Sequence, residues 1–261
     1  MSNNSEKEFN KKLAILSHEV KTPLALIANT AYVANLRLKD NTISHEELKK
    51  YFENILNNCY KLDLITDNMM NLTEIQPTHY QVIDMNEFCE KFSAQLEALH
   101  SSYDFDFKLD VKTDSEKKNI PIPPTERVIL NLITNAIKYN SKKTKKVTLT
   151  VSNDEKFVYF TVKDNGDGIS EEMLPRITEE YFRVSMTQAS GLGLGLNVVS
   201  KIVKNAGGEL TFKSQLKKGT EVTFTLPVNG NPSILSFNSD NYEYKPSKVT
   251  FLKEFSTLEK L

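Results

Sequence analysis

The sequence contains few cysteines, little net charge and no long apolar run. Its only cysteines are Cys59 and Cys89, and neither lies in a CxxC pair or another metal-ligand spacing. We therefore expect free, buried thiols in a reducing compartment and no cysteine-bound metal. The net charge of −1 argues against broad affinity for nucleic acid or for an anionic membrane.

The absence of a long apolar run bears on localisation. No stretch approaches the roughly 20 residues that a membrane-spanning helix needs. The polar start MSNNSEKEFNKK also lacks the apolar core of a signal peptide. We therefore expect a cytoplasmic chain without a membrane segment. With 39% hydrophobic and 26% charged residues, the composition is that of an ordinary globular protein.

The first part of the chain predicts two long helices. Apolar residues recur at steps of three and four from Leu13 to Ala31, and again from Leu48 to Met69. A hairpin this long cannot bury both apolar faces by itself. We therefore expect a homodimer in which two hairpins form an antiparallel four-helix bundle. The alternative is a monomeric hairpin packed on the rest of the chain.

The later part of the chain mixes strands and helices. YDFDFKLDV alternates as a strand does, and KVTLTVS and KFVYFTVK flank a turn at Asn153 and Asp154. Helices are expected over PPTERVILNLITNAIKYN, from about Ser170, and after Gly195. ELTFKS and TEVTFTLP predict the last two strands. Because short turns join adjacent strands, this pattern predicts an α/β sandwich with a mixed sheet, not a doubly wound parallel sheet.

These patterns divide the chain into four parts. A helical hairpin is expected over residues 1–75, and a proline-containing linker without helical period over 76–85. The α/β sandwich would occupy residues 86–227. A turn-rich C-terminal extension follows over 228–261, and no motif in it indicates a role.

The string LSHEVKTPL carries the first candidate site. His18 lies opposite the apolar stripe, so its imidazole should face solvent, where the neutral ring is a competent nucleophile near pH 7. Glu19 could orient the ring or accept its proton. Thr22 follows one turn later on the same face, and Pro23 should bend the helix. Taken alone, such a pair is more often ordinary solvated surface than a site.

The string NLITNAIKY places polar side chains along one face of a predicted helix. Asn131 and Asn135 are one turn apart, followed by Lys138 and Tyr139. Asparagine is costly at a helical core position without a polar partner, and Mg²⁺ is one such partner for an amide oxygen. Lys138 offers positive charge to phosphate oxygens. The alternative is a polar stripe on an exposed face.

The string DNGDGI directly follows a predicted strand. Asp164 ends that strand, and Gly166 and Gly168 permit a ligand to approach the backbone closely. A buried carboxylate needs a donor, which the exocyclic amine of adenine would supply. An ordinary turn and a calcium-like loop remain equally open on these residues alone.

Three alternating glycines precede the next predicted helix. Gly191, Gly193 and Gly195 could cradle phosphate through backbone N–H groups and the helix N-terminus. The run has neither the lysine of a Walker loop nor the spacing of a dinucleotide fingerprint. Gly219 and Thr220 open the last strand and are weak evidence alone.

The order of these motifs over residues 8–227 resembles that of the sensor histidine kinases of two-component systems. The resemblance implies a dimerising hairpin for histidine phosphotransfer, followed by an ATP-binding sandwich of the type shared with DNA gyrase. It implies phosphorylation of His18 by ATP with Mg²⁺. The phosphoryl group would then pass to an aspartate in the receiver domain of a response regulator, and the kinase could also dephosphorylate that regulator.

The resemblance also implies roles for single residues. His18 would be the phosphoacceptor, Glu19 its acid/base partner, and Thr22 a residue needed to dephosphorylate the regulator. Asn135 would ligate Mg²⁺. The residues expected around the nucleotide are Asn131, Asn135, Lys138, Tyr139, Asp164, Gly166, Gly168, Ile169, Arg183, Gly191, Leu192, Gly193, Leu194, Gly195, Leu196 and Thr220.

The segment ITEEYFRVS departs from the family pattern. It keeps the aromatic pair and the arginine of residues 181–183, but Thr178, Glu180 and Ser185 replace an aromatic, a basic and an acidic residue. The stretch 184–190 is also short. In the family this segment is a lid, so lid closure and transfer rate are in question more than nucleotide binding. The alternative functions are a dimeric scaffold that transfers poorly and an ATP-driven clamp, although clamps lack the His-Glu helix.

Overall fold

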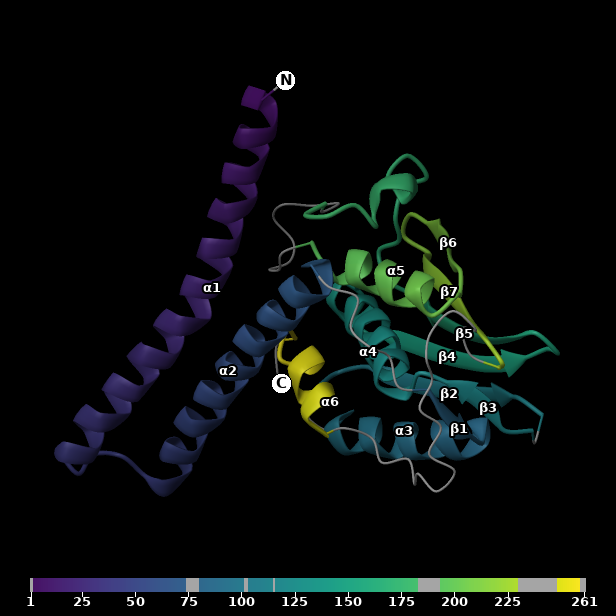
Figure 1. The fold of residues 1–261 in the computed structure, drawn as a ribbon. Coiled ribbons are helices and arrows are strands. Elements are labelled where there is room, and N and C mark those ends of the chain that lie inside the picture. The colour runs from purple at the N-terminus through teal and green to yellow at the C-terminus, as the bar shows by residue number, and fades with distance from the viewer. Residues whose placement is uncertain are drawn as a thin grey trace.

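The computed structural model of the protein describes residues 2–73, 80–100, 103–114, 116–182, 193–229 and 248–258. A helical hairpin lies beside an α/β sandwich (Figure 1). This confirms the predicted fold class, including the mixed sheet.

The hairpin consists of α1 (Ser2–Lys39) and α2 (His45–Thr73). A capping box starts α2: the backbone N–H of Ser44 donates to Glu47 Oε2 at 3.0 Å, and the N–H of Glu47 donates to Ser44 Oγ at 3.2 Å. Helix α1 continues through Pro23. Within the described ranges, neither these helices nor the others combine the length and apolarity that crossing a membrane requires.

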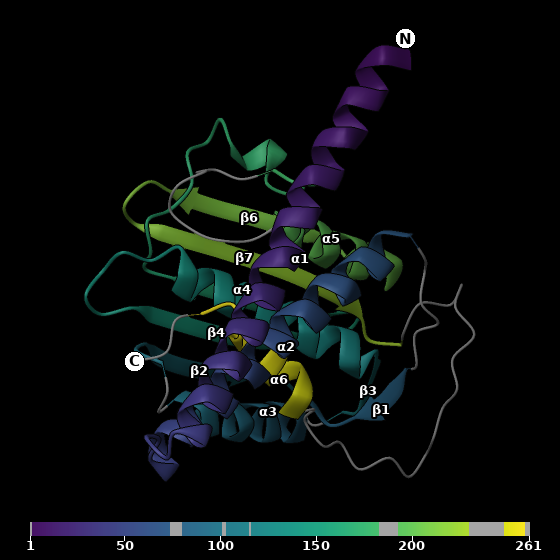
Figure 2. The same ribbon diagram turned by 90° about the vertical axis from the view of Figure 1, so that its left-hand side faces the viewer.

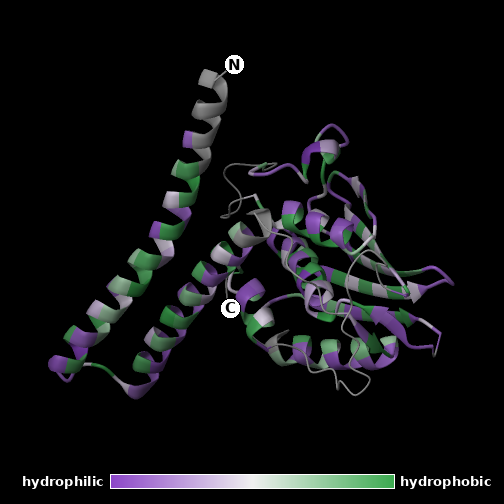
Figure 3. Ribbon diagram, viewed as in Figure 1, coloured by the Kyte–Doolittle hydropathy of each residue, from purple (hydrophilic) through white to green (hydrophobic). Residues whose placement is uncertain are grey.

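The hairpin leaves apolar side chains uncovered in a single chain. The green bands in Figure 3 mark where apolar residues lie along α1 and α2. Leu24 is 55% exposed, and Phe52 is 57% exposed. The prediction that both cysteines are buried is wrong for Cys59, which is exposed on α2, whereas Cys89 is buried. The reason is that Cys59 shares the apolar rhythm of α2, and one chain does not cover all of that helix.

Five strands form the main sheet in the order β2 (Asp106–Lys112), β4 (Lys146–Asn153), β5 (Phe157–Asp164), β7 (Gly219–Pro227) and β6 (Leu210–Gln215). Strands β2 and β4 run parallel, and the other neighbours are antiparallel. The sheet therefore brings the end of β5 beside the start of β7, although these segments are far apart in sequence.

A second, two-stranded sheet joins β1 (Gln81–Ile83) to β3 (Lys118–Ile120). The expected linker over 76–85 is therefore wrong for residues 81–83. Three-residue strands are too short to show a period in sequence, and burial of Ile83 and Ile120 in the core holds them.

Helices α3 (Met85–His100), α4 (Ile122–Lys138) and α5 (Gly195–Asn205) cover one face of the main sheet, as the two orthogonal views show (Figures 1 and 2). The core lies between these layers. On the inner face of the sheet, the rings of Phe160 and Phe224 stack with centroids 4.7 Å apart.

The helix expected from about Ser170 is wrong. Residues Leu174–Arg176 form a single 3₁₀ turn instead. Pro175 removes a backbone donor, and Ile177 is the one buried residue of segment 171–180. Without an apolar stripe, an α-helix here would bury little surface.

The C-terminal extension contains a helix that completes the core. In α6 (Lys248–Phe255), Phe251 and Phe255 have no exposed surface. The Phe251 ring lies 5.0 Å from that of Phe92, and the Tyr103 hydroxyl donates to the Phe255 carbonyl at 3.1 Å. This part of the extension is therefore integral to the sandwich.

Candidate active site

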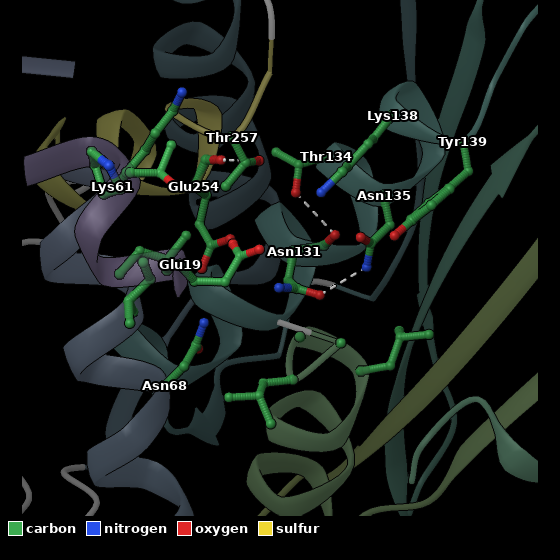
Figure 4. Close-up of a pocket in the computed structure, with 18 of the residues that line it drawn as sticks. Glu19, Lys61, Asn68, Asn131, Thr134, Asn135, Lys138, Tyr139, Glu254 and Thr257 are labelled. Atoms are coloured by element: carbon green, nitrogen blue, oxygen red, sulfur yellow. Dashed lines mark hydrogen bonds between the residues drawn. The ribbon is translucent and has the colours of Figure 1, made fainter. Parts of the chain in front are cut away.

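Two adjacent pockets contain most of the predicted site residues. The first, about 310 Å³, lies between the hairpin and the sandwich (Figure 4). The second, about 150 Å³, lies between α4 and the sheet. Five residues line both pockets and form their shared wall. They come from the C-terminal end of α4, from the segment between β5 and α5, and from α5: Asn135, Tyr139, Ile177, Phe182 and Leu196.

The hairpin contributes His18, Glu19 and Thr22 to the first pocket. His18 and Thr22 are exposed, and Glu19 is half-buried. The Thr22 hydroxyl donates to the His18 carbonyl at 3.0 Å, one turn earlier in the same helix. This leaves the hydroxyl oxygen free to accept a further hydrogen bond.

Helix α4 contributes the asparagines and the lysine of the first pocket. The side-chain amide of Asn135 donates to Asn131 Oδ1 at 3.0 Å. This bond orients Asn135 so that its own carbonyl oxygen remains a possible metal ligand. Among the described residues, no three His, Cys, Asp or Glu side chains gather as metal ligands. A hard cation held by Asn135 would therefore need most of its oxygen ligands from phosphate and water.

Asp164 presents one carboxylate oxygen to the protein. Its Oδ1 accepts the backbone N–H groups of Gly166, at 2.6 Å, and of Thr220, at 3.1 Å. Within the described ranges, no hydrogen bond engages Oδ2, and Asp164 lines the second pocket. Burial raises the pKa of Asp164, and the two N–H donors oppose that effect. A ligand amine in this pocket would meet an acceptor already held in place.

Two glycines in the site have steric reasons for being glycine. Gly168 has φ +69°, and a Cβ there would lie 2.1 Å from the Gln215 carbonyl oxygen. Gly195 begins α5 against α4, and a Cβ there would lie 2.9 Å from Asn131 Nδ2. Gly168 therefore lets the loop after β5 pass close to Gln215, and Gly195 lets the start of α5 approach Asn131.

The structure brings together the predicted residues that it describes. The first pocket contains His18, Glu19, Thr22, Asn131, Asn135, Lys138, Tyr139, Gly193, Leu194, Gly195 and Leu196. The second contains Asn135, Tyr139, Asp164, Gly168, Ile169, Leu196 and Thr220, with Gly166 bonded to Asp164. Arg183, Gly191 and Leu192 lie outside the described residues.

Sequence reasoning missed several residues of the first pocket. Asn68 and Lys61 come from α2, and Glu254 and Thr257 from the C-terminal extension. Figure 4 shows Glu254 beside Asn131, with Lys61, Asn68 and Thr257 around them. No motif marks them, because tertiary packing alone brings them to the pocket.

Two family models match the chain. "His Kinase A (phospho-acceptor) domain" matches residues 10–78, and "Histidine kinase-, DNA gyrase B-, and HSP90-like ATPase" matches residues 122–230. Among curated proteins, the signal transduction histidine-protein kinase ArlS of Staphylococcus aureus is 31% identical over 84% of this chain and 50% of its own length. The chain spans about half to two thirds of the length of the curated relatives it matches.

Solved structures share the fold. The histidine kinase AdeS of Acinetobacter baumannii aligns with a TM-score of 0.57 and 21% identity, over 81% of this chain and 98% of that one. The histidine kinase ThkA, in a complex with the response regulator protein TrrA, aligns with a TM-score of 0.58 and 21% identity, over 87% of this chain and 66% of that one.

Proposed function

Because the chain belongs to the sensor histidine kinases of two-component systems, we propose that it phosphorylates His18 with ATP and passes the phosphoryl group to a response regulator. One observation carries this proposal. The pocket that contains His18 from α1 also contains Asn135 and Lys138 from α4 and Gly193 from the glycine run. Acceptor and phosphate-binding groups therefore face one space, as phosphoryl transfer requires.

The second pocket is proposed to bind the adenine. Its wall is mainly apolar, which suits a flat base, and Asp164 supplies the free acceptor for the exocyclic amine. Tyr139 and Leu196 line both pockets, so the nucleotide would pass along them from base to phosphate. Asn135 is proposed to hold Mg²⁺, which would neutralise phosphate charge during transfer.

The chemistry assigned to the chain is attack by imidazole. The unprotonated nitrogen of His18 forms a bond to the γ-phosphorus, and the bond from that phosphorus to the β–γ bridging oxygen breaks to release ADP. Glu19 takes the proton from the other ring nitrogen. Lys138 offsets negative charge on the phosphate oxygens. The phosphoryl group then passes to an aspartate of a receiver domain docked on the hairpin near His18.

The hairpin is proposed to dimerise. In one chain Leu13 is 50% exposed, Leu24 is 55% exposed and Leu56 is 52% exposed. Pairing two hairpins in a four-helix bundle would remove such surface from water. Light scattering of the purified protein should give twice the mass of the chain, 29.7 kDa.

Incubation with ATP labelled at the γ-phosphate tests the proposal. The protein should acquire label that is labile in acid and stable in base, as a phosphohistidine is. His18→Gln should remove the label while ATP binding persists. His45→Gln, at the first residue of α2, is the matched control and should label normally. Wild-type labelling of His18→Gln would overturn the acceptor assignment, and ATP binding without any label would favour a non-catalytic scaffold.

A further inference from the structure

Helix α6 lies between the hairpin and the sandwich, beside both α2 and α4 (Figure 1). The ATPase family model ends at residue 230, before this helix begins. Helix α6 therefore contacts both the hairpin and the sandwich. The two faces of α6 differ in chemistry, and each face contacts a different part of the molecule.

One face of α6 belongs to the sandwich. Phe251 and Phe255 are fully buried, and the Phe255 ring lies 5.1 Å from Tyr103 and 6.3 Å from Phe105. Leu258, just beyond the helix, joins the same core. This packing is extensive enough that α6 should move as one body with the ATP-binding part.

The other face of α6 binds the hairpin through Lys253. Its ammonium nitrogen lies 2.7 Å from Asp63 Oδ2 and 3.0 Å from Asp67 Oδ2, both on α2. The lysine side chain is only 19% exposed, so solvent screens these ion pairs less than it would at an open surface. Burial lowers the pKa of Lys253, but the two carboxylates outweigh that effect and leave it raised.

A second set of polar contacts continues from α2 into the pocket. Arg127 on α4 donates to Asn68 Oδ1 on α2 at 2.8 Å, and its Nε lies 3.9 Å from Glu254 Oε1. Glu254 is 2% exposed and also accepts a hydrogen bond from the side chain of Asn131. Asn131 in turn holds Asn135. Polar contacts therefore run from the hairpin through α6 to the proposed metal ligand.

We propose that α6 is an interdomain clasp, in which Lys253 is a positioning residue that holds the ATP-binding part where His18 faces the nucleotide. This inference rests on the function proposed above. The acceptor and the proposed metal ligand come from different parts of the chain, so the geometry of transfer depends on non-covalent contacts between those parts. Lys253 touches neither pocket and acts only through the placement of the two parts.

Substitution of Lys253 tests the clasp without disturbing the core. In the full chain, Lys253→Ala should lower the kcat of His18 autophosphorylation about threefold to tenfold, with the KM for ATP and the calorimetric ATP affinity near wild type. Lys91→Ala is the matched control, because it breaks a comparable 2.7 Å ion pair to Glu87 within α3, away from the hairpin. It should leave both kcat and KM unchanged.

Charge reversal separates positioning from general damage. Lys253→Glu should lower kcat further than alanine does, since it would repel both aspartates. Adding Asp63→Lys and Asp67→Lys to that variant should restore at least half of the wild-type kcat. A wild-type or higher kcat in Lys253→Ala, or no rescue by the reversed pair, would overturn the clasp. If wild type forms no phosphohistidine, the proposed function itself fails, which is a distinguishable result.

Discussion

The backbone N–H of Thr220, at the start of β7, donates a hydrogen bond of 3.1 Å to Oδ1 of Asp164, at the end of β5. The N–H of Gly166 binds the same oxygen. The protein therefore uses one carboxylate oxygen to fix the side chain and leaves Oδ2 for a ligand. This division of roles explains why a carboxylate suits the position.

Asp164→Asn should weaken ATP binding about tenfold to a hundredfold. The amide oxygen can still accept from the two backbone N–H groups, so the amide nitrogen would then present a donor to the adenine amine, itself a donor. Calorimetry with ATP measures the change. Asp154→Asn is a suitable control, because Asp154 also accepts two backbone N–H groups but lies in the β4–β5 turn. Unchanged affinity in Asp164→Asn would remove the second pocket as the adenine site.

Asn135→Ala should spare nucleotide affinity in the absence of Mg²⁺ and reduce the stimulation of autophosphorylation by Mg²⁺ about tenfold or more. The physical reason is loss of the amide oxygen proposed as ligand. A titration of rate against MgCl₂ measures it. Asn131→Ala breaks the hydrogen bond between Asn135 and Asn131 but keeps the amide oxygen of Asn135. The Mg²⁺ dependence of this control variant should therefore change less. Equal effects of the two variants would contradict the ligand role.

Thr22→Ala should lower dephosphorylation of the regulator while His18 phosphorylation and transfer stay near wild type. The hydroxyl donates to the His18 carbonyl, and its oxygen can still accept from a water aimed at the regulator's phosphoaspartate. Thr22→Ser keeps the hydroxyl and should keep the activity. If Thr22 only eases α1 into Pro23, all three rates and the melting temperature should shift together. Measurement of the three rates and the Tm on one preparation decides between these outcomes.

Titration of Glu254 should make the free energy of unfolding fall as pH rises toward neutrality. Burial raises its pKa from 4.5 to about 7, and Arg127 and Asn131 offset only part of that effect. Because the folded pKa lies above the unfolded one, this contribution is fully present below about pH 4.5 and is lost as pH rises through about 7. The resulting loss in the free energy of unfolding is roughly 3 kcal/mol at most.

Glu254→Gln removes that titration, so denaturant unfolding should show the variant and wild type diverging between pH 5 and pH 8, with the variant more stable at the upper end. The charged groups that act on Glu254 are Arg127 on α4, Asp67 on α2 and neighbouring Lys253. Glu155→Gln, on an exposed turn, controls for the change in net charge. Parallel pH profiles for Glu254→Gln and wild type would rule out this titration.

Much of the site could be predicted from sequence because each motif is local. Asn131 and Asn135 are one turn apart, so any helix over them places them on one face. Asp164 ends an alternating strand, and Gly168 needs a positive φ that favours glycine. The alternation of β4 and β5 likewise predicted the hairpin that the structure contains. Local periodicity and backbone sterics are properties of the sequence itself.

Other features needed the tertiary structure. Strand β1 is three residues long and is defined by pairing with β3, so no period could reveal it. Leu174–Arg176 form a 3₁₀ turn and no α-helix, because Ile177 alone is buried in segment 171–180, and propensity alone does not show how little of a segment is buried. The exposure of Cys59 depends on which face of α2 another element covers.

Local patterns in the sequence identify which residues could do the chemistry: the His-Glu pair, the two asparagines, the aspartate and the glycine runs. Tertiary packing, by contrast, is what brings Lys253 to α2 and Glu254 to Asn131, although both residues lie more than a hundred residues beyond α4. The physical reason is that burial of Phe251 and Phe255 in the sandwich core fixes the place of α6. Packing between residues far apart in the sequence leaves no periodic pattern among neighbouring residues, so it cannot be predicted from such patterns.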